Sequence, residues 1–331
     1  MRVRIGFVAL VVLVGLAVIV GPSITGASVP APPSRFVSII QDQGNGFRWQ
    51  MSLYSSQTGK LSRSLASFSQ SSFTNNGLAL APSGNAVYFT LIPRHAGRRF
   101  GLRLMRFDVE TRRQTLIADG AQPAISDDGT QLAYATFPHG LAVRELASGQ
   151  TRKIGLAAQL GRQADPLKAA VVWLGDGTDV AIIPSPPAWD LVRRQPSPAH
   201  WCGTTSSHAV IVLVHVPTPP APLTADCVRL AGPAMIGAIA LAASPTSPTS
   251  VLVATDGPGD STRVEQIADT GKTEHLLTIR SSLPVAFDPS GTHLMYLIGH
   301  SPPTLWQATI TDGHLTNRLR LPKHNWGAIA W

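Results

Sequence analysis

A short hairpin motif recurs along this chain, and its repetition constrains the fold more than any other feature of the sequence. The clearest copy, Ala124–Thr136, is an apolar run, a Ser-Asp-Asp-Gly turn and a second run in which apolar residues alternate with others. Asp supplies a local side-chain hydrogen bond and Gly supplies a positive φ, and a tight hairpin turn needs both. The motif therefore predicts two antiparallel strands joined by a tight turn.

Five copies of this motif are recognisable, and the turn of the fourth copy lacks glycine. They are Leu78–Thr90, Ala124–Thr136, Val171–Pro184, Ile239–Thr255 and Val285–Leu297. Three of the four turn-to-turn spacings are 44 to 48 residues, and the remaining one, 70 residues, is longer by about one loop insertion. A period of about 40–45 residues with four strands in each unit is typical of the blades of a β-propeller.

The two ends of the chain indicate how many blades the ring contains. The segments Phe36–Ile40, Trp49–Ser55 and Leu61–Phe68 have the pattern of strands b, c and d of a blade, while residues 327–331 have that of an inner strand a. Together they would form one composite blade that closes the ring and removes its free sheet edges. The fold class predicted is therefore all-β, a six-bladed β-propeller of four-stranded blades, with seven blades as the alternative.

The turns of two copies give the repeat a more specific form. Residues 81–84 are Ala-Pro-Ser-Gly and residues 288–291 are Asp-Pro-Ser-Gly, each between two apolar strands. In this form the repeat resembles that of the TolB family of periplasmic six-bladed propellers, over most of residues 36–331. The resemblance implies a TolB-like propeller whose inner strands line a central channel and whose d–a and b–c loops form the binding face. The separate N-terminal α/β domain of that family is not expected, since propeller strands begin directly after a linker.

The first 33 residues have the layout of an export signal. Arg2 and Arg4 precede an uninterrupted apolar run of 16 residues, Ile5–Val20, and small residues follow at positions 26–28. This length lies between a signal-peptide core of about 7–15 residues and a spanning helix of about 18 or more. A cleaved signal peptide and a retained membrane anchor therefore both remain open. Residues 34–331 are predicted to form one extracytoplasmic propeller domain, secreted or anchored to the cytoplasmic membrane by residues 5–20.

The formal net charge is +8 and the isoelectric point is near 10.1. The Lys and Arg residues are dispersed and form no stripe interleaved with aromatic residues, which argues against nucleic acid as a partner. Without Arg2 and Arg4 the charge is still +6, so the exported part remains basic. Such a surface favours an anionic envelope polymer as one class of partner, with a solvated basic surface as the alternative.

Candidate binding residues are expected on the face formed by the d–a and b–c loops. The largest insertion, residues 184–208, and a basic loop in the first internal blade combine aromatic and Arg side chains, which recognition sites favour. The candidates in these two loops are Trp189, Arg193, Arg194, His200, Trp201, Arg94, Arg98 and Arg99. Polar residues just before the inner strands would form a rim at the channel mouth, namely Asn75, Asn76, Gln122, Lys168, Ser282 and Asn325. The alternatives are a loop packed without a partner, and simple solvation of charged and polar loop residues.

Cys202 and Cys227 are the only two cysteines. An even pair in an exported chain favours a disulfide. If the outer strand of this blade began near Asp226, Cys227 would lie toward the opposite face from Cys202. The insertion would then have to fold back to bring the two Cα atoms within about 7 Å.

No residue pattern predicts catalysis. The inner-strand cores carry no acidic residue facing the channel, no G-x-S-x-G motif occurs, and no pair of His has a zinc-ligand spacing. The tandem Asp127 and Asp128 are expected to be turn residues rather than a catalytic pair. The sequence therefore predicts a monomeric, non-catalytic module without cofactor or metal that docks a protein or peptide at the bacterial cell envelope. The alternative is an extracytoplasmic hydrolase or lyase with a divergent site at the channel mouth.

Overall fold

The computed structural model describes most of the propeller and none of residues 1–32. The described residues are 33–42, 48–69, 71–93, 101–137, 140–156, 170–175, 177–183, 189–190, 195–196, 199–201, 204–206, 210–229, 238–257, 261–299, 304–321, 326 and 328–331. Residues 31–331 form one compact unit. The predicted signal peptide or membrane anchor lies outside the described residues. Within them, no helix is long and apolar enough to cross a membrane.

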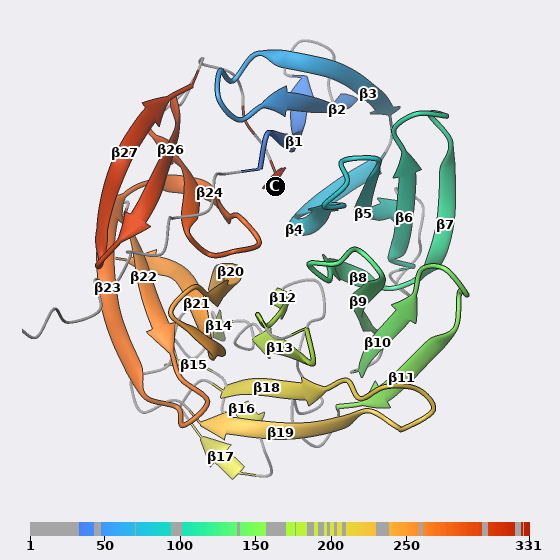
Figure 1. The fold of residues 1–331 in the computed structure, drawn as a ribbon, viewed down its shortest axis with the longest axis vertical. Helices are drawn as coiled ribbons and strands as arrows, with labels where there is room; N and C mark the ends of the chain where they lie inside the picture. Colours follow the sequence, from blue (N-terminus) through green and yellow to red (C-terminus); the bar gives the residue numbers. More distant parts are fainter. Residues whose placement is uncertain are drawn as a thin grey trace, which may run out of the picture. The chain divides into compact units, whose positions relative to one another are not determined.

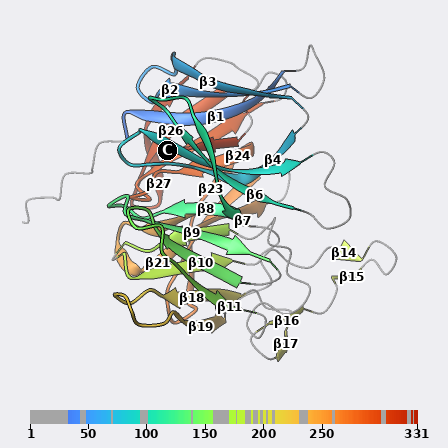
Figure 2. The same cartoon turned by 90° about the vertical axis from the view of Figure 1, so that its right-hand side faces the viewer.

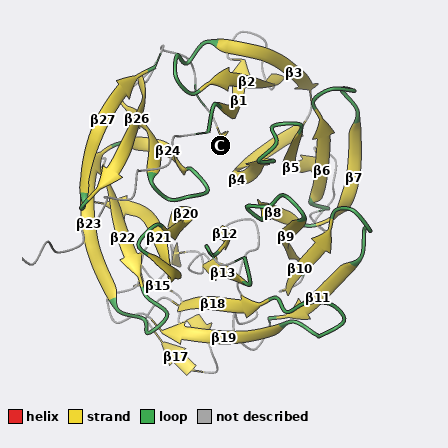
Figure 3. Cartoon of the chain, in the orientation of Figure 1, coloured by secondary structure: helices red, strands yellow, loops and turns green. Residues whose placement is uncertain are grey.

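The described strands form six four-stranded antiparallel sheets, arranged as blades around a central channel (Figures 1 and 3). Because each strand reverses the direction of the one before it, the d–a and b–c loops lie at one end of the channel, here called the loop face. The a–b and c–d turns lie at the other end, here called the turn face. The predicted all-β, six-bladed propeller is confirmed.

Four blades take four consecutive strands each, from the innermost to the outermost. Blade 2 contains β4 (Ser71–Leu80), β5 (Ala86–Pro93), β6 (Arg103–Asp108) and β7 (Gln114–Asp119), and blade 3 contains β8 (Ala121–Ile125), β9 (Gln131–Thr136), β10 (Gly140–Glu145) and β11 (Thr151–Gly155). Blade 5 contains β20 (Ala238–Ser244), β21 (Ser247–Gly257), β22 (Ser261–Ile267) and β23 (Thr273–Arg280), and blade 6 contains β24 (Ser282–Phe287), β25 (His293–Ile298), β26 (Thr304–Thr311) and β27 (His314–Arg320).

Blade 4 contains the predicted insertion. Its four strands are β12 (Ala170–Trp173), β13 (Asp179–Ile183), β18 (Val210–His215) and β19 (Thr224–Arg229). Between β13 and β18 the chain forms two extra hairpins, β14 (Trp189–Asp190) with β15 (Gln195–Pro196), and β16 (Ala199–Trp201) with β17 (Thr204–Ser206). Figure 2 shows these short strands on one side of the ring. A b–c connection lies on the loop face, so the insertion enlarges that face.

Blade 1 is the composite blade that the sequence predicts. Its sheet order is β28 (Ala328–Ala330), β1 (Arg35–Asp42), β2 (Arg48–Ser55) and β3 (Leu61–Ser69). Strand β28 pairs antiparallel with β1, with Ala330 opposite Val37 and Ala328 opposite Ile39. The two ends of the propeller are thus joined through one continuous sheet, which leaves no open blade edge at the seam.

The a–b turns explain why the motif contains glycine. Gly84, Gly129, Gly177 and Gly291 have φ between +68° and +71°. The N–H of each glycine donates to the carbonyl oxygen three residues earlier, over 2.7–2.9 Å. Residues other than glycine rarely adopt this conformation. Gly291 is constrained twice, because a Cβ there would overlap the carbonyl oxygen of Ala243 in the neighbouring blade.

The apolar core lies between adjacent blades rather than inside any one of them. Side chains on facing surfaces of blades 3 and 4 form one cluster, and those of blades 1 and 2 form another. Two buried tryptophans add hydrogen bonds between inner strands. Trp173 Nε1 donates to the Ala124 carbonyl oxygen over 3.0 Å, and Trp331 Nε1 donates to that of Ala286 over 3.5 Å. These bonds connect blade 4 to blade 3 and blade 1 to blade 6.

Candidate functional site

The central channel holds a small cavity of about 160 Å³. Its walls are the inner strands β4, β8, β12, β20, β24 and β28, which contribute mainly small and aliphatic residues. Two carboxylates line it, Asp127 and Asp288, and each belongs to the turn that follows an inner strand. The acidic groups of the channel therefore lie at its turn-face end.

Asp127 and Asp128 are adjacent in the chain and both exposed, but their pKa values are shifted in opposite directions. Partial desolvation at the channel end raises the pKa of Asp127 above its ordinary value, and the negative charges of Asp128 and Asp288 raise it further. A hydrogen bond from the Ser126 hydroxyl (2.6 Å), followed by one from the Thr130 N–H (3.0 Å), lowers the pKa of Asp128. Asp128 is thus the turn residue that the sequence predicts, whereas Asp127 faces the channel end.

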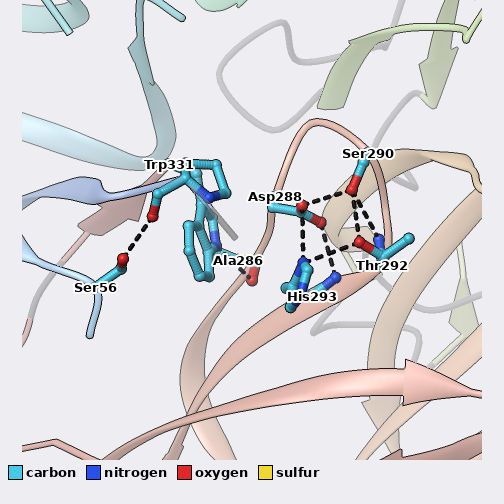
Figure 4. Close-up of polar contacts among 8 residues, drawn as sticks. Ser56, Ala286, Asp288, Ser290, Thr292, His293 and Trp331 are labelled. Carbon is cyan, nitrogen blue, oxygen red and sulfur yellow. Dashed lines mark hydrogen bonds and ion pairs between the residues drawn. The ribbon is translucent and has the colours of Figure 1, made fainter. Parts of the chain in front are cut away.

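Asp288 is the centre of a buried polar cluster beside this channel end (Figure 4). One carboxylate oxygen accepts the backbone N–H of His293 over 2.8 Å, and the other lies 3.1 Å from His293 Nδ1. The side chains of Asp288 and His293 are only 3% and 4% exposed. The Ser290 hydroxyl donates to Asp288 over 2.6 Å, and Thr292 Oγ1 lies 2.9 Å from His293 Nδ1.

This cluster does not have the arrangement of a catalytic triad. In a triad the serine hydroxyl is hydrogen-bonded to the histidine, which the carboxylate orients from its other nitrogen. Here the Ser290 hydroxyl bonds to the carboxylate of Asp288 and to Thr292, and it makes no hydrogen bond to His293. The cluster fixes the a–b turn of blade 6 and so holds Asp288 at the channel end.

The substitution Asp127→Asn is expected to stabilise the protein near neutral pH. Because the pKa of Asp127 is higher in the folded state than its ordinary value of 3.8, the unfolded chain loses this proton first as the pH rises, and stability falls. The neutral Asn does not undergo that loss. The gain in the free energy of unfolding should stay below about 1 kcal/mol, because solvent screens an exposed carboxylate. Thermal unfolding should show the gain near neutral pH and none well below the ordinary pKa. An equal gain at both pH values would contradict this account.

Part of the predicted loop-face site lies on the two extra hairpins. Trp189 is in β14, and His200 and Trp201 are in β16, so the insertion brings these three positions into one segment of the loop face. Asn76 lies near the middle of β4, not before the inner strand as the sequence predicts, because this strand begins at Ser71. Several other candidates of the loop face lie outside the described residues, namely Arg193, Arg194, Arg94, Arg98, Arg99, Lys168 and Asn325.

Gln122 differs from its expected position on a solvated rim. It is buried, with 1% of its surface exposed, and its φ is +57°. Strand β8 begins at Ala121, and an irregularity in its pairing with β9 falls between Ala121 and Ala124. The backbone N–H of Gln122 donates to Thr90 Oγ1 of blade 2 over 3.1 Å. The irregular start of the strand thus places Gln122 in the interface between blades 2 and 3.

Cys227 is better placed for a disulfide than the sequence suggests. Strand β19 begins at Thr224, so Cys227 lies in its second half, nearer the loop face, opposite Val212 of β18. The strand starts two residues before Asp226, which is earlier than the sequence suggests. Cys227 is not a free thiol. Its predicted partner, Cys202, lies outside the described residues, so their pairing stays a prediction.

Among the described residues, no group of three or more His, Cys, Asp and Glu side chains is arranged to hold a metal ion.

One similarity to a solved structure, that of TolB, supports the fold. The chain matches no family model, and no curated protein matches it in sequence. The crystal structure of TolB from Acinetobacter baumannii is similar, with 14% identity and a TM-score of 0.60, over 92% of this chain and 68% of that one. A gluconolactonase from Xanthomonas campestris has 15% identity and a TM-score of 0.48, over 91% of this chain and 90% of that one. The Cps50 (Swd1) propeller domain from Myceliophteria thermophila has 13% identity and a TM-score of 0.47, over 92% and 91%.

The chain therefore has a TolB-like six-bladed propeller fold. At these identities the similarity concerns the fold alone, and propellers with this architecture serve both binding and catalysis.

Proposed function

We propose that this protein is an extracytoplasmic, non-catalytic binding module that docks a protein or peptide on its loop face. The observation that carries the proposal is the insertion between β13 and β18. It interrupts the repeat more than any other described connection, and it adds two hairpins to the loop face of one blade (Figure 2). Loops that depart from a rigid scaffold are where binding residues concentrate.

The composition of the insertion supports docking rather than simple packing. Trp189 and Trp201 lie on the two hairpins, with His200 beside Trp201. Trp and Arg dominate the binding energy of many protein interfaces, and the connecting residues Arg193 and Arg194 add two positive charges. The b–c connection of blade 2, which carries Arg94, Arg98 and Arg99, belongs to the same face by topology and favours an acidic partner.

The proposed location follows from the first residues of the chain. Their basic start and apolar run support export, and the basic charge of the remaining chain suits the anionic surfaces of a cell envelope. An anionic envelope polymer is therefore the second class of partner for this face. The proposed contact with the membrane is through residues 5–20 alone.

The test replaces residues 187–198 with a Gly-Ser linker of equal length and compares chemical cross-linking in intact cells. Lys272→Ala, an exposed change in a turn-face connection, is the matched control. The same cross-linked partner should be recovered with the unchanged protein and the control, and its yield should fall at least about tenfold with the linker variant. Unchanged recovery with the linker variant would refute docking on the insertion.

A second candidate function is a hydrolase or lyase at the turn-face end of the channel. The raised pKa of Asp127, beside the second carboxylate of Asp288, favours it, since catalytic acids have pKa values shifted in this direction. Turnover of a lactone or ester panel that disappears in Asp127→Asn, or a stoichiometric bound divalent cation, would favour the enzyme. Absence of turnover in the unchanged protein would favour the binding module.

A further inference from the structure

A groove between blades 2 and 3 opens on the turn face, opposite the proposed docking face. Its cavity is about 480 Å³, within the size range of small-molecule sites. The polar residues that line it are Ser83, Asn85, Tyr88, Arg106, Thr115, Asp128 and Arg144. Arginines from both blades therefore converge on one cavity.

Arg106, on β6, has a counter-ion within its own strand. Its Nη2 lies 3.1 Å from Asp108 Oδ2, and about a third of its side chain is exposed. The other carboxylate oxygen of Asp108 accepts the N–H and the hydroxyl of Thr111, each over 2.9 Å. These hydrogen bonds lower the pKa of Asp108, so it stays charged and offsets the charge of Arg106.

Arg144, on β10, has no such partner. Within the described part of the chain its guanidinium makes no hydrogen bond and no ion pair, although the residue is half-buried. It lies beside Gly149, where an added Cβ would approach Nη2 to 3.0 Å, so the turn leaves room for it. A guanidinium presents five donors in a planar fork that matches a carboxylate or phosphate. The donors of Arg144 are therefore available to a ligand.

Two buried tyrosines show that the positive charges converge. Burial raises the pKa of Tyr88, and the charges of both Arg106 and Arg144 oppose that rise. Burial also raises the pKa of Tyr134, and Arg144 again opposes it. Arg144 thus lies close to the side chains of both blades, and Tyr88 is near both guanidiniums.

Asp128 is the other charged group that lines the groove. Its carboxylate already accepts bonds from the Ser126 hydroxyl, the Thr130 N–H and the Thr130 hydroxyl, and it makes no ion pair with Arg144. Its charge disfavours an anion at the a–b turn of blade 3. An anion would therefore be placed between Arg144 and Arg106, toward the outer strands.

We propose that this groove binds a small oxyanion, a carboxylate or a phosphate group, between Arg106 and Arg144. The unpartnered guanidinium of Arg144 supplies a bidentate site, and Arg106 adds further N–H donors while it keeps its ion pair with Asp108. Hydrogen bonds between ionised partners are shorter and stronger than neutral ones, so these two side chains dominate recognition. The site is separate from the loop face and does not depend on the proposed docking function.

The test is isothermal titration calorimetry of the full-length protein at low ionic strength, with citrate and inorganic phosphate as the two probes. Whichever probe binds the unchanged protein, Arg144→Gln should raise its dissociation constant at least about tenfold, since the substitution removes a charge-assisted contact. Arg63→Gln, on the exposed surface of β3, removes the same charge elsewhere and should leave binding unchanged. Arg144→Lys keeps the charge but loses the planar fork, so binding should be intermediate.

Preference for citrate would assign a carboxylate ligand, and preference for phosphate a phosphoryl ligand; either supports the site. The proposal is overturned if neither probe binds at millimolar concentration, or if Arg63→Gln weakens binding as much as Arg144→Gln. Circular dichroism of each variant should match the unchanged protein. If the Arg144→Gln variant does not fold, the affinity of the Arg144→Lys variant becomes the test. Unchanged affinity of the Arg144→Lys variant would then overturn the proposal.

Discussion

Deletion of residues 326–331 is expected to abolish stable folding of the propeller. The deletion removes β28, which closes blade 1, together with the buried Trp326 and Trp331. The ring of Trp326 contacts Phe36 and Tyr54, with centroids 5.7 and 5.0 Å apart. Loss of one large buried aromatic side chain costs about 3–5 kcal/mol, and a domain has about 5–15 kcal/mol in total. Chemical denaturation should therefore show no cooperative transition.

Two milder variants separate ring closure from the mere loss of apolar surface. Trp331→Phe keeps the strand but loses the bond to Ala286 and part of the buried ring, so it should cost about 1–3 kcal/mol. Leu319→Ala changes a residue of β27 that is 37% exposed, and it should cost less than about 0.5 kcal/mol. A truncated protein that unfolds at the same denaturant concentration as the intact chain would disprove closure through β28.

Asp288→Ala is expected to lower the free energy of unfolding by about 2–4 kcal/mol. It leaves the backbone N–H of His293, the imidazole of His293 and the hydroxyl of Ser290 without their buried acceptor. Buried donors that lose their partner cost more than an average hydrogen bond contributes, because they also remain desolvated. The measurement is urea unfolding near neutral pH, with the slope of the transition checked for change.

Asp128→Ala is the matched control for this prediction. Asp128 also binds the hydroxyl and N–H groups of its own a–b turn, but it is exposed. Water replaces the lost bonds there, so the cost should stay below about 1 kcal/mol. Asp288→Asn, which keeps one acceptor oxygen, should fall between the two. Equal costs for Asp288→Ala and Asp128→Ala would show that the buried cluster does not stabilise blade 6.

The sequence predicts the blades because their signals are local. A turn such as residues 126–129 contains its own hydrogen-bonding side chain and its own glycine, and the alternation beside it sets which side chains are buried. The bounds of several strands follow closely, for example β9 (Gln131–Thr136) within the motif Ala124–Thr136. The seam between β28 and β1 follows from counting strands at the two ends.

Features that depend on packing between blades do not follow from the sequence. The burial of Gln122 arises from a strand irregularity next to Thr90 of another blade. Within one blade, β4 begins at Ser71, earlier than the apolar run at Leu78, and its pairing with β5 shifts register between Phe73 and Leu78. The channel position of Asp127 and the convergence of Arg144 with Arg106 each join residues of different blades. The local sequence pattern does not predict the positions of these residues.

Site-specific photo-crosslinking tests the docking proposal most directly. A photoreactive amino acid replaces Gln195, on the hairpin strand β15 of the loop face, or Lys272, in a connection of the turn face. The account predicts one defined cross-linked partner in living cells from position 195 and none from position 272. The same partner captured from position 272 alone, or with equal yield from both positions, would contradict it.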